Sequence, residues 1–407
     1  MRSLGTRAVM AIACAGAVGV AGAACGGTPE VTAAPVKADA VKADAGKVPP
    51  GQRGKLLSSR PLTNAAALPS ASANRFITYT SEGAGGKRIT VSGTVAVPKG
   101  TPPKGGWPVL SWAHGTTGTA DACAPSADTA DGPAHDYLAI TEQYLDKWVQ
   151  NGFAVVQTDY EGLGTPGGHP YMNGASEANT VTDIVRAARQ AGHRIGRDWF
   201  VAGHSQGGQA TLYTAATARQ PRDIRLRGAV SIAPGSSMSQ AAQYVKAQYP
   251  GAEIALPFLF VLLNGAHAAD PTFVPEDLLT DDAAAIAKAG RTNACLAQLK
   301  QLTANLPLTD VFRPDADLTR FENYYDAQEA LGLTIEVPTL VAQGTADREV
   351  SPAATQNIVT DLCKRYGTIA YRSFDGADHR GSINASFEAS LRFAKAIQNG
   401  EAPPTTC

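Results

Sequence analysis

The segment GHSQGG at residues 203–208 contains a serine whose surroundings suit nucleophilic chemistry. Gly203, Ser205 and Gly207 form the pattern GxSxG, between the apolar run WFVAG and the alanine-rich run QATLYTAATA. A strand, a sharp turn and a helix would hold Ser205 in strained geometry, with glycines where neighbouring elements approach closely. A serine hydroxyl becomes a good nucleophile only beside a base. Ser205 is therefore a candidate if the chain also supplies a histidine and an acid.

The base should follow Ser205 in the chain, because hydrolases built on such a turn present serine, acid and histidine in that order. Two histidines lie downstream, His267 and His379. His379, in DGADHRGS, follows the last apolar run on a glycine-containing loop, whereas His267 lies in a long segment without strand patterns. We therefore predict His379 as the base.

The acid should follow a strand that ends beside the nucleophile. Asp347, in TLVAQGTADREV, comes just after such a run and would hold the imidazole in the correct tautomer. Asp375 and Asp378 are nearer to His379 in the chain, but neither directly follows this strand. Asp347 is the predicted acid, with the other two as alternatives.

An oxyanion hole needs two amide donors near the serine. One is the backbone N–H of Gln206, directly after the nucleophile, and the other should lie in the loop after PVLSWA, in HGTTG. Thr116 is the predicted second donor, with Gly115 as the alternative. We assign His114 and His204 structural roles in holding this loop and the turn.

The composition excludes several classes of function. The formal charge is −1, so nothing in the chain's charge attracts nucleic acid. The glycine-rich segment DYEGLGTPGGHPY lacks the lysine and the spacing of a phosphate-binding loop. There is no HExxH and no clustered CxxC, so we expect no metal site and no cofactor.

Short apolar runs separated by turn residues predict eight strands, beginning after about residue 73. The runs are RFITYTS, RITVSGTVAVP, PVLSWA, GFAVVQT, WFVAG, GAVSIA, TLVAQG and TIAYRSF. Helical patterns lie between the later runs, as at 175–192, where apolar residues recur at the spacing of one helix face. Alternating strands and helices predict an α/β fold with a mostly parallel sheet.

A gap of about a hundred residues separates the sixth run from the seventh, far more than a crossover needs. Residues 234–337 should therefore form an inserted subdomain between core segments 73–233 and 338–407. Its apolar run LPFLFVLL is shorter than the roughly 20 residues of a membrane span. We interpret this run as a buried helix; the alternative is an apolar wall facing a substrate.

Residues 1–25 have the basic start and apolar middle of a secretory leader. Their ending GAAC resembles a bacterial lipobox, which would make Cys25 a lipidated first residue; the alternative is cleavage after Ala23 or Ala24. Residues 26–72 are rich in Ala, Pro, Lys, Gly and Ser and predict a flexible tether. The remaining cysteines predict two disulfides with three open connectivities. They are Cys123, Cys295, Cys363 and Cys407.

Together, SWAHGTTG, DYEGLGTPG, GHSQGGQA, QGTADREV and ADHR resemble the secretory lipase family of α/β-hydrolases, including the fungal lipase A type. The resemblance implies the α/β-hydrolase fold, with a helical cap inserted after the sixth strand, and the triad Ser205, Asp347 and His379. It also implies pairing of Cys123 with Cys295 and of Cys363 with Cys407.

The implied function is that of a secreted serine hydrolase that cleaves carboxylic esters, with a small-molecule or lipid ester as substrate. We expect it outside the cell, anchored to the outer face of a bacterial cell membrane through lipidated Cys25. One alternative is an α/β-hydrolase aminopeptidase, which would need an acidic group to capture an amino terminus. Another is a non-catalytic surface-binding protein on the same fold.

Overall fold

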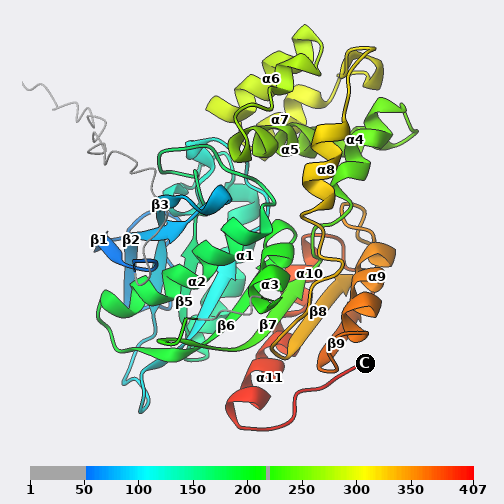
Figure 1. Ribbon diagram of the computed structural model, residues 1–407. Coiled ribbons are helices and arrows are strands. Elements are labelled where there is room, and N and C mark those ends of the chain that lie inside the picture. The colour runs from blue at the N-terminus through cyan, green and yellow to red at the C-terminus, as the bar shows by residue number, and fades with distance from the viewer. Residues whose placement is uncertain (1–51, 217–220) are drawn as a thin grey trace, which may run out of the picture. The chain divides into compact units, whose positions relative to one another are not determined.

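A nine-stranded sheet forms the centre of the described part of the chain, residues 52–216 and 221–407 of the computed structural model (Figure 1). The strands are β1 (Leu56–Pro61), β2 (Ala73–Glu82), β3 (Arg88–Val97), β4 (Trp107–Ala113), β5 (Ala154–Thr158), β6 (Ile195–His204), β7 (Arg225–Ile232), β8 (Thr339–Gly344) and β9 (Ile369–Phe374). Their order is β1-β2-β3-β5-β4-β6-β7-β8-β9. The sheet is parallel from β5 to β9 and antiparallel at the β1–β3 edge. The predicted α/β-hydrolase fold is confirmed.

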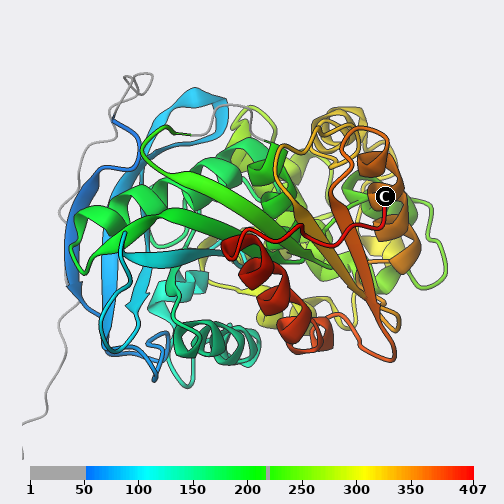
Figure 2. The same ribbon diagram turned by 90° about the horizontal axis from the view of Figure 1, so that it is seen from below.

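Helices cover both faces of this sheet (Figures 1 and 2). On one face α2 (Gly174–Gln190), α3 (Gln206–Ala216) and α9 (Pro352–Cys363) pack on the strands. On the other lie α1 (His135–Gln150), α10 (Gly381–Ala385) and α11 (Phe387–Gln398). The predicted helix at 175–192 is α2: the Asn173 side chain caps it by accepting the Ser176 N–H at 3.0 Å, and its apolar face is buried.

Five α-helices, three short 3-10 helices and no strand occupy the segment between β7 and β8. The α-helices are α4 (Met238–Lys246), α5 (Leu256–Ala269), α6 (Asp281–Thr292), α7 (Leu296–Thr303) and α8 (Thr319–Asp326). Their apolar side chains form a separate buried cluster, and α5, α6 and α7 gather beyond one end of the sheet (Figure 1).

The apolar run LPFLFVLL lies in α5, where all residues from Leu256 to Ala266 except Phe258 are buried. The helical stretch Ala252–Ala269 is longer than the run alone, and by length and composition it could cross a membrane. However, 61% of this stretch is buried inside the fold, as in the core helix of a globular domain. Its burial favours the interpretation as a buried helix.

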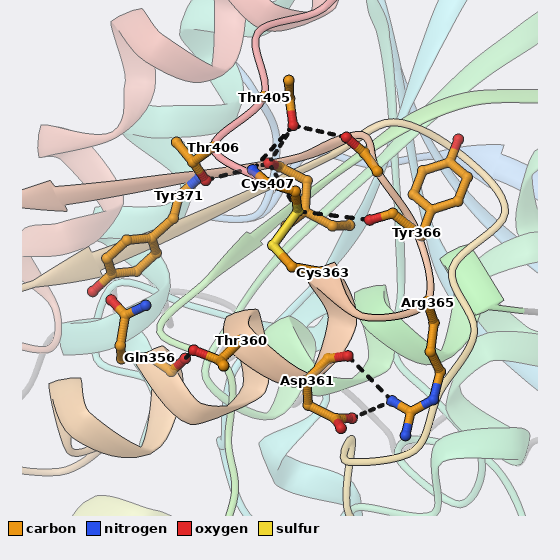
Figure 3. The surroundings of a disulfide bond; sticks show 12 residues. Gln356, Thr360, Asp361, Cys363, Arg365, Tyr366, Tyr371, Thr405, Thr406 and Cys407 are labelled. Atoms are coloured by element: carbon orange, nitrogen blue, oxygen red, sulfur yellow. Dashed lines mark hydrogen bonds and ion pairs between the residues drawn. A yellow bond between two sulfur atoms is a disulfide. The ribbon is translucent and has the colours of Figure 1, made fainter.

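The C-terminal segment returns from α11 to the far edge of the sheet (Figure 2). There Cys407 is joined to Cys363, the last residue of α9, by a disulfide (Figure 3). The Thr406 N–H donates to the Ile369 carbonyl at 2.7 Å. The tail is thus pinned to β9 and α9 by one covalent link and a backbone hydrogen bond.

All eight predicted strands are present, but the count of eight was wrong because β1 was missed. β1 lies inside the predicted tether 26–72, and its sequence LLSSRP shows no alternating pattern. It is recognised only by its backbone pairing with β2. Because β1 adds one strand at the start of the sheet, the inserted helices follow the seventh strand instead of the sixth. Residues 1–51, including the predicted leader, Cys25 and the start of the tether, lie outside the described residues.

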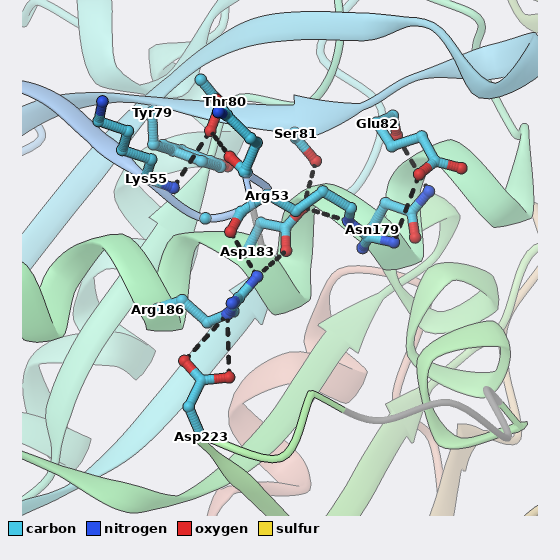
Figure 4. Close-up of polar contacts among 12 residues, drawn as sticks. Arg53, Lys55, Tyr79, Thr80, Ser81, Glu82, Asn179, Asp183, Arg186 and Asp223 are labelled. Carbon is cyan, nitrogen blue, oxygen red and sulfur yellow. Dashed lines mark hydrogen bonds and ion pairs between the residues drawn. The ribbon is translucent and has the colours of Figure 1, made fainter. Parts of the chain in front are cut away.

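The segment before β1 is also held to the core. Arg53 Nε donates to Asp183 Oδ2 at 2.9 Å, and the buried Ser81 hydroxyl donates to the same oxygen at 2.8 Å (Figure 4). Arg186 reaches the Arg53 carbonyl and also pairs with Asp223 at 3.0 Å. Residues from 52 onward therefore belong to the folded domain.

Candidate active site

Ser205 lies in the turn between β6 and α3 with φ at 58°. This left-handed conformation is costly for a residue with a Cβ atom. A Cβ built on Gly207 would lie 1.8 Å from the Ala113 carbonyl oxygen, and one built on Gly203 would lie 2.2 Å from the Gly207 carbonyl oxygen. Both glycines are therefore required for the close approach of β4, β6 and α3 that produces the turn.

His379 and Asp347 lie together, as the sequence predicted. His379 Nδ1 is 2.8 Å from Asp347 Oδ2. The other carboxylate oxygen accepts the backbone N–H groups of Glu349 and Val350, each at 2.9 Å. Burial alone would raise the pKa of Asp347, but the hydrogen bond and charge of His379, with the Val350 and Gln343 donors, lower it overall. The Asp347 carboxylate is therefore held ionised beside the His379 imidazole.

The two alternative acids are engaged elsewhere. Asp378 Oδ1 accepts the Gly381 N–H at 2.7 Å, and Asp375 accepts from the Thr345 hydroxyl at 3.2 Å. Each contact stabilises the loop that carries His379.

Ser205 and His379 line one small cavity of about 20 Å³. Within the described residues, no hydrogen bond joins their side chains. Phe258 of α5 and Leu296 of α7 close the cavity from the side of the inserted helices. A space of this size holds about one water molecule, whereas ligand pockets usually exceed 300 Å³. In this conformation the space beside Ser205 is therefore too small to hold an ester.

The two predicted oxyanion donors also lie near Ser205. Gln206 is the first residue of α3, where backbone amides have no acceptor within the helix. Thr116 lines the same cavity as Ser205, and its hydroxyl is 2.6 Å from the Tyr171 hydroxyl. The Gly115 N–H already donates to the Tyr137 hydroxyl at 2.8 Å. That contact favours Thr116 over the alternative, Gly115.

His204 and His114 are fully buried and occupy structural positions. His204 Nε2 is 2.9 Å from the His379 carbonyl oxygen, and burial holds the pKa of His204 well below its usual value. His114 Nδ1 is 2.7 Å from the Gly115 carbonyl oxygen, and burial lowers the pKa of His114 to about 4. Both rings are therefore neutral, and they fix the backbone at His379 and in the loop that carries Thr116.

The side chain of Gln206 takes part in a buried network that the sequence reasoning missed. Its Nε2 donates to Glu177 Oε1 at 2.7 Å and lies 2.9 Å from His169 Nε2. Glu177 Oε1 also accepts the Met172 N–H at 3.0 Å, while Oε2 is buried without a partner. Burial raises the pKa of Glu177 to about 8. The signal was an acid on the apolar face of the predicted helix, four residues before Val181.

Glu349 is a second missed residue at the site. It lines the cavity with Ser205, and its Oε2 is 3.8 Å from His379 Nε2. Its Oε1 is 3.4 Å from Lys300 Nζ on α7. The only sequence signal was its place two residues after Asp347.

A disulfide joins Cys123 to Cys295, the residue before α7, as the sequence resemblance implied. The backbone of Gly118 forms a bridge with Cys295, and the Leu296 N–H donates to the Thr117 carbonyl at 2.8 Å. The start of α7 is thus attached to the loop that carries Thr116.

One group of potential metal ligands occurs in the described part of the chain: Asp128, His135 and Glu142 place one donor atom each within 4.8 Å of one another. His135 Nδ1 already lies 2.6 Å from Asp128 Oδ2. Burial, together with the charge of Asp128, raises the pKa of Glu142 to about 8. When Glu142 is protonated, it no longer repels the Asp128 carboxylate, so the group needs no cation. The absence of a metal requirement stays a prediction.

Solved structures share this architecture. Candida antarctica lipase A in its closed state matches with a TM-score of 0.72 and 19% identity, over 87% of this chain and 84% of that one. The rice cell wall degrading esterase LipA from Xanthomonas oryzae matches with a TM-score of 0.66 and 21% identity, over 85% and 96%. A comparison with curated proteins finds no significant match. The resemblance to lipase A-type hydrolases is confirmed at the level of the fold.

The family model described as serine aminopeptidase, S33 matches residues 134–380, more than half of the chain. The matched region contains Ser205, Asp347 and His379. The chain belongs to the serine aminopeptidase S33 family and is a serine hydrolase of the α/β-hydrolase fold.

Proposed function

We propose that the protein hydrolyses carboxylic esters through an acyl-enzyme on Ser205. The observation that carries this proposal is the His379–Asp347 pair at 2.8 Å, in which His379 lines one cavity with the strained Ser205. His379 takes the proton of Ser205 as the hydroxyl attacks the carbonyl, and the amides of Gln206 and Thr116 stabilise the oxyanion. His379 then protonates the leaving alcohol, and water releases the acid.

An uncharged or apolar acyl group suits the walls of the cavity, because Phe258 and Leu296 face Ser205. The two solved structures named above are a lipase and an esterase by name, which supports an ester substrate. In this proposal the helices of residues 234–337 form a cap, which must shift before the cavity of about 20 Å³ can admit an ester.

The second candidate is an aminopeptidase, which the description of the family favours. Glu349 is the acidic group at the site that such an enzyme would need. Its carboxylate is paired with Lys300 at 3.4 Å, so Glu349 by itself does not distinguish an amino terminus from another cation. Ester hydrolysis remains the leading proposal because the two solved structures named above are a lipase and an esterase. A non-catalytic binding protein would be expected to lack a triad member, and all three are present.

An assay of the wild type and Ser205→Ala distinguishes these candidates. The substrates are aryl esters of increasing acyl length and amino-acid anilides. We expect ester cleavage in the wild type and a loss of at least about a thousandfold in the variant. Ser351→Ala, at an exposed serine, is the matched control and should keep full activity. Equal ester cleavage by the wild type and Ser205→Ala would refute the acyl-enzyme. Cleavage of anilides alone would establish the aminopeptidase.

The proposed location is outside the cell, with Cys25 lipidated and the following residues acting as a tether. The two disulfides support an oxidising compartment. Labelling cells with a radioactive fatty acid tests the anchor: we expect label in the wild type and none in Cys25→Ala. A mature wild-type chain without label would refute lipidation.

A further inference from the structure

The carboxylate of Glu349 lies beside the nitrogen of His379 that performs the proton transfers. His379 Nδ1 is hydrogen-bonded to Asp347, and His379 Nε2 lies 3.8 Å from Glu349 Oε2. In a serine hydrolase Nε2 receives the proton of the serine and then gives it to the leaving group. A charge next to Nε2 is therefore next to the position of the leaving alcohol.

Glu349 is attached to the catalytic loop, not to the inserted helices. Its backbone N–H donates to Asp347 Oδ1 at 2.9 Å, and Val350 donates to the same oxygen. The position of Glu349 relative to His379 should therefore be retained when α5 and α7 move. In the closed conformation its side chain keeps 28% of its surface exposed.

The side chain of Lys300 already forms an ion pair with the Glu349 carboxylate. Lys300 Nζ lies 3.4 Å from Glu349 Oε1 and 5.5 Å from the centre of the Phe258 ring. Arg380 also lines the cavity, but it donates to Asp136 at 2.9 Å and lies over the Tyr137 ring. Lys300 is thus the cation that a substrate charge would replace, between a carboxylate and an aromatic ring.

We propose that Glu349 is a specificity-determining residue that favours esters whose leaving alcohol carries a positive charge, as in amino-alcohol esters. This inference rests on the proposed ester hydrolysis. In that reaction the bond between the acyl carbon and the alcohol oxygen breaks, the alcohol oxygen takes the proton of His379 Nε2, and Ser205 keeps the acyl group until water releases it. The cationic group would bind Glu349 in place of Lys300.

The test compares butyrylcholine with 3,3-dimethylbutyl butyrate, two esters of the same shape that differ in one positive charge. The measured quantity is the ratio of their kcat/KM values, in which acyl preference and cap movement cancel. A partly exposed ion pair should favour the choline ester in the wild type by roughly fivefold.

Two variants should move this ratio in opposite directions. Glu349→Gln removes the charge and should bring the ratio close to unity, whereas Lys300→Gln removes the competing cation and should raise it above the wild-type value. Glu388→Gln, on an exposed part of α11, is the charge-matched control and should leave the ratio unchanged. A purely structural role for Glu349 would lower both rates together.

Several results would overturn the inference. The first is an equal ratio of the two kcat/KM values in the wild type and in Glu349→Gln. The second is that the wild type cleaves aryl butyrates but neither butyrylcholine nor 3,3-dimethylbutyl butyrate. If Glu349→Gln does not fold, an unchanged or lower ratio in Lys300→Gln decides against the inference. Failure to cleave any ester, aryl butyrates included, refutes the proposed function itself.

Discussion

Glu177 should make the stability of this protein depend on pH in a way that one substitution removes. Burial raises the pKa of Glu177 from 4.5 to about 8 in the folded protein. Between these two values the folded state holds a proton that the unfolded state releases. The contribution of Glu177 to stability is therefore complete below about pH 4.5 and is lost as the pH rises to about 8.

The magnitude follows from the two pKa values. Raising the pH from about 5 to about 7 should cost roughly 2.5 kcal/mol of unfolding free energy through Glu177 alone. Glu177→Gln keeps an oxygen that can accept the Gln206 and Met172 donors, but it does not titrate. Burial also raises the pKa of Asp159 to about 6, but Asp159 is present in both proteins and cancels in their difference.

Guanidinium unfolding of the wild type and Glu177→Gln between about pH 5 and pH 8 measures this difference. The advantage of the wild type over the variant should shrink by roughly 2.5 kcal/mol from pH 5 to pH 7. Glu388→Gln, at an exposed position, should differ from the wild type by a constant amount. A constant difference for Glu177→Gln as well would refute a protonated, buried Glu177.

Three further predictions concern the site and its scaffold. Asp347→Asn should lower kcat by about 10⁴ without unfolding the protein, as esterase kinetics and circular dichroism would show, because an amide cannot fix the imidazole tautomer. Replacing Cys363 and Cys407 with serine should lower the unfolding free energy by about 4 kcal/mol in denaturant titrations, because the disulfide spans 44 residues. Gly207→Ala should abolish activity and lower the melting temperature, because its Cβ would overlap the Ala113 carbonyl; an active, stable variant would contradict this.

The elements around the nucleophile could be predicted because their signals are local. WFVAG before GxSxG and the alanine-rich run after it correspond to β6 and α3. The order of Ser205, Asp347 and His379 selected a histidine and an aspartate that the structure brings within 2.8 Å of each other, beside the turn that carries Ser205. Strand periodicity also located eight of the nine strands. β1 escaped because an edge strand with mostly exposed side chains has no apolar alternation, and only pairing with β2 reveals it.

The contacts that refine the site join residues far apart in the chain, so no local pattern encodes them. The Tyr137 hydroxyl engages the Gly115 amide and favours Thr116 as oxyanion donor. The sequence by itself allowed three disulfide connectivities, and in the fold Cys123 lies 5.5 Å from Cys295 between their Cα atoms, within bonding reach.

The sequence by itself determined which residues could act as nucleophile, acid and base, because each follows a strand pattern and they occur in the order serine, acid, histidine. The parallel pairing of β6 to β9 then places the carboxyl ends of these strands at the same end of the sheet. Only the tertiary structure decided the surroundings of these residues. It buries Glu177 against Gln206, sets Glu349 beside His379 and Lys300, and closes the cavity with Phe258. The reason is physical: burial and charge pairing depend on side-chain packing between distant segments, whereas strand and turn patterns depend on neighbours in the chain.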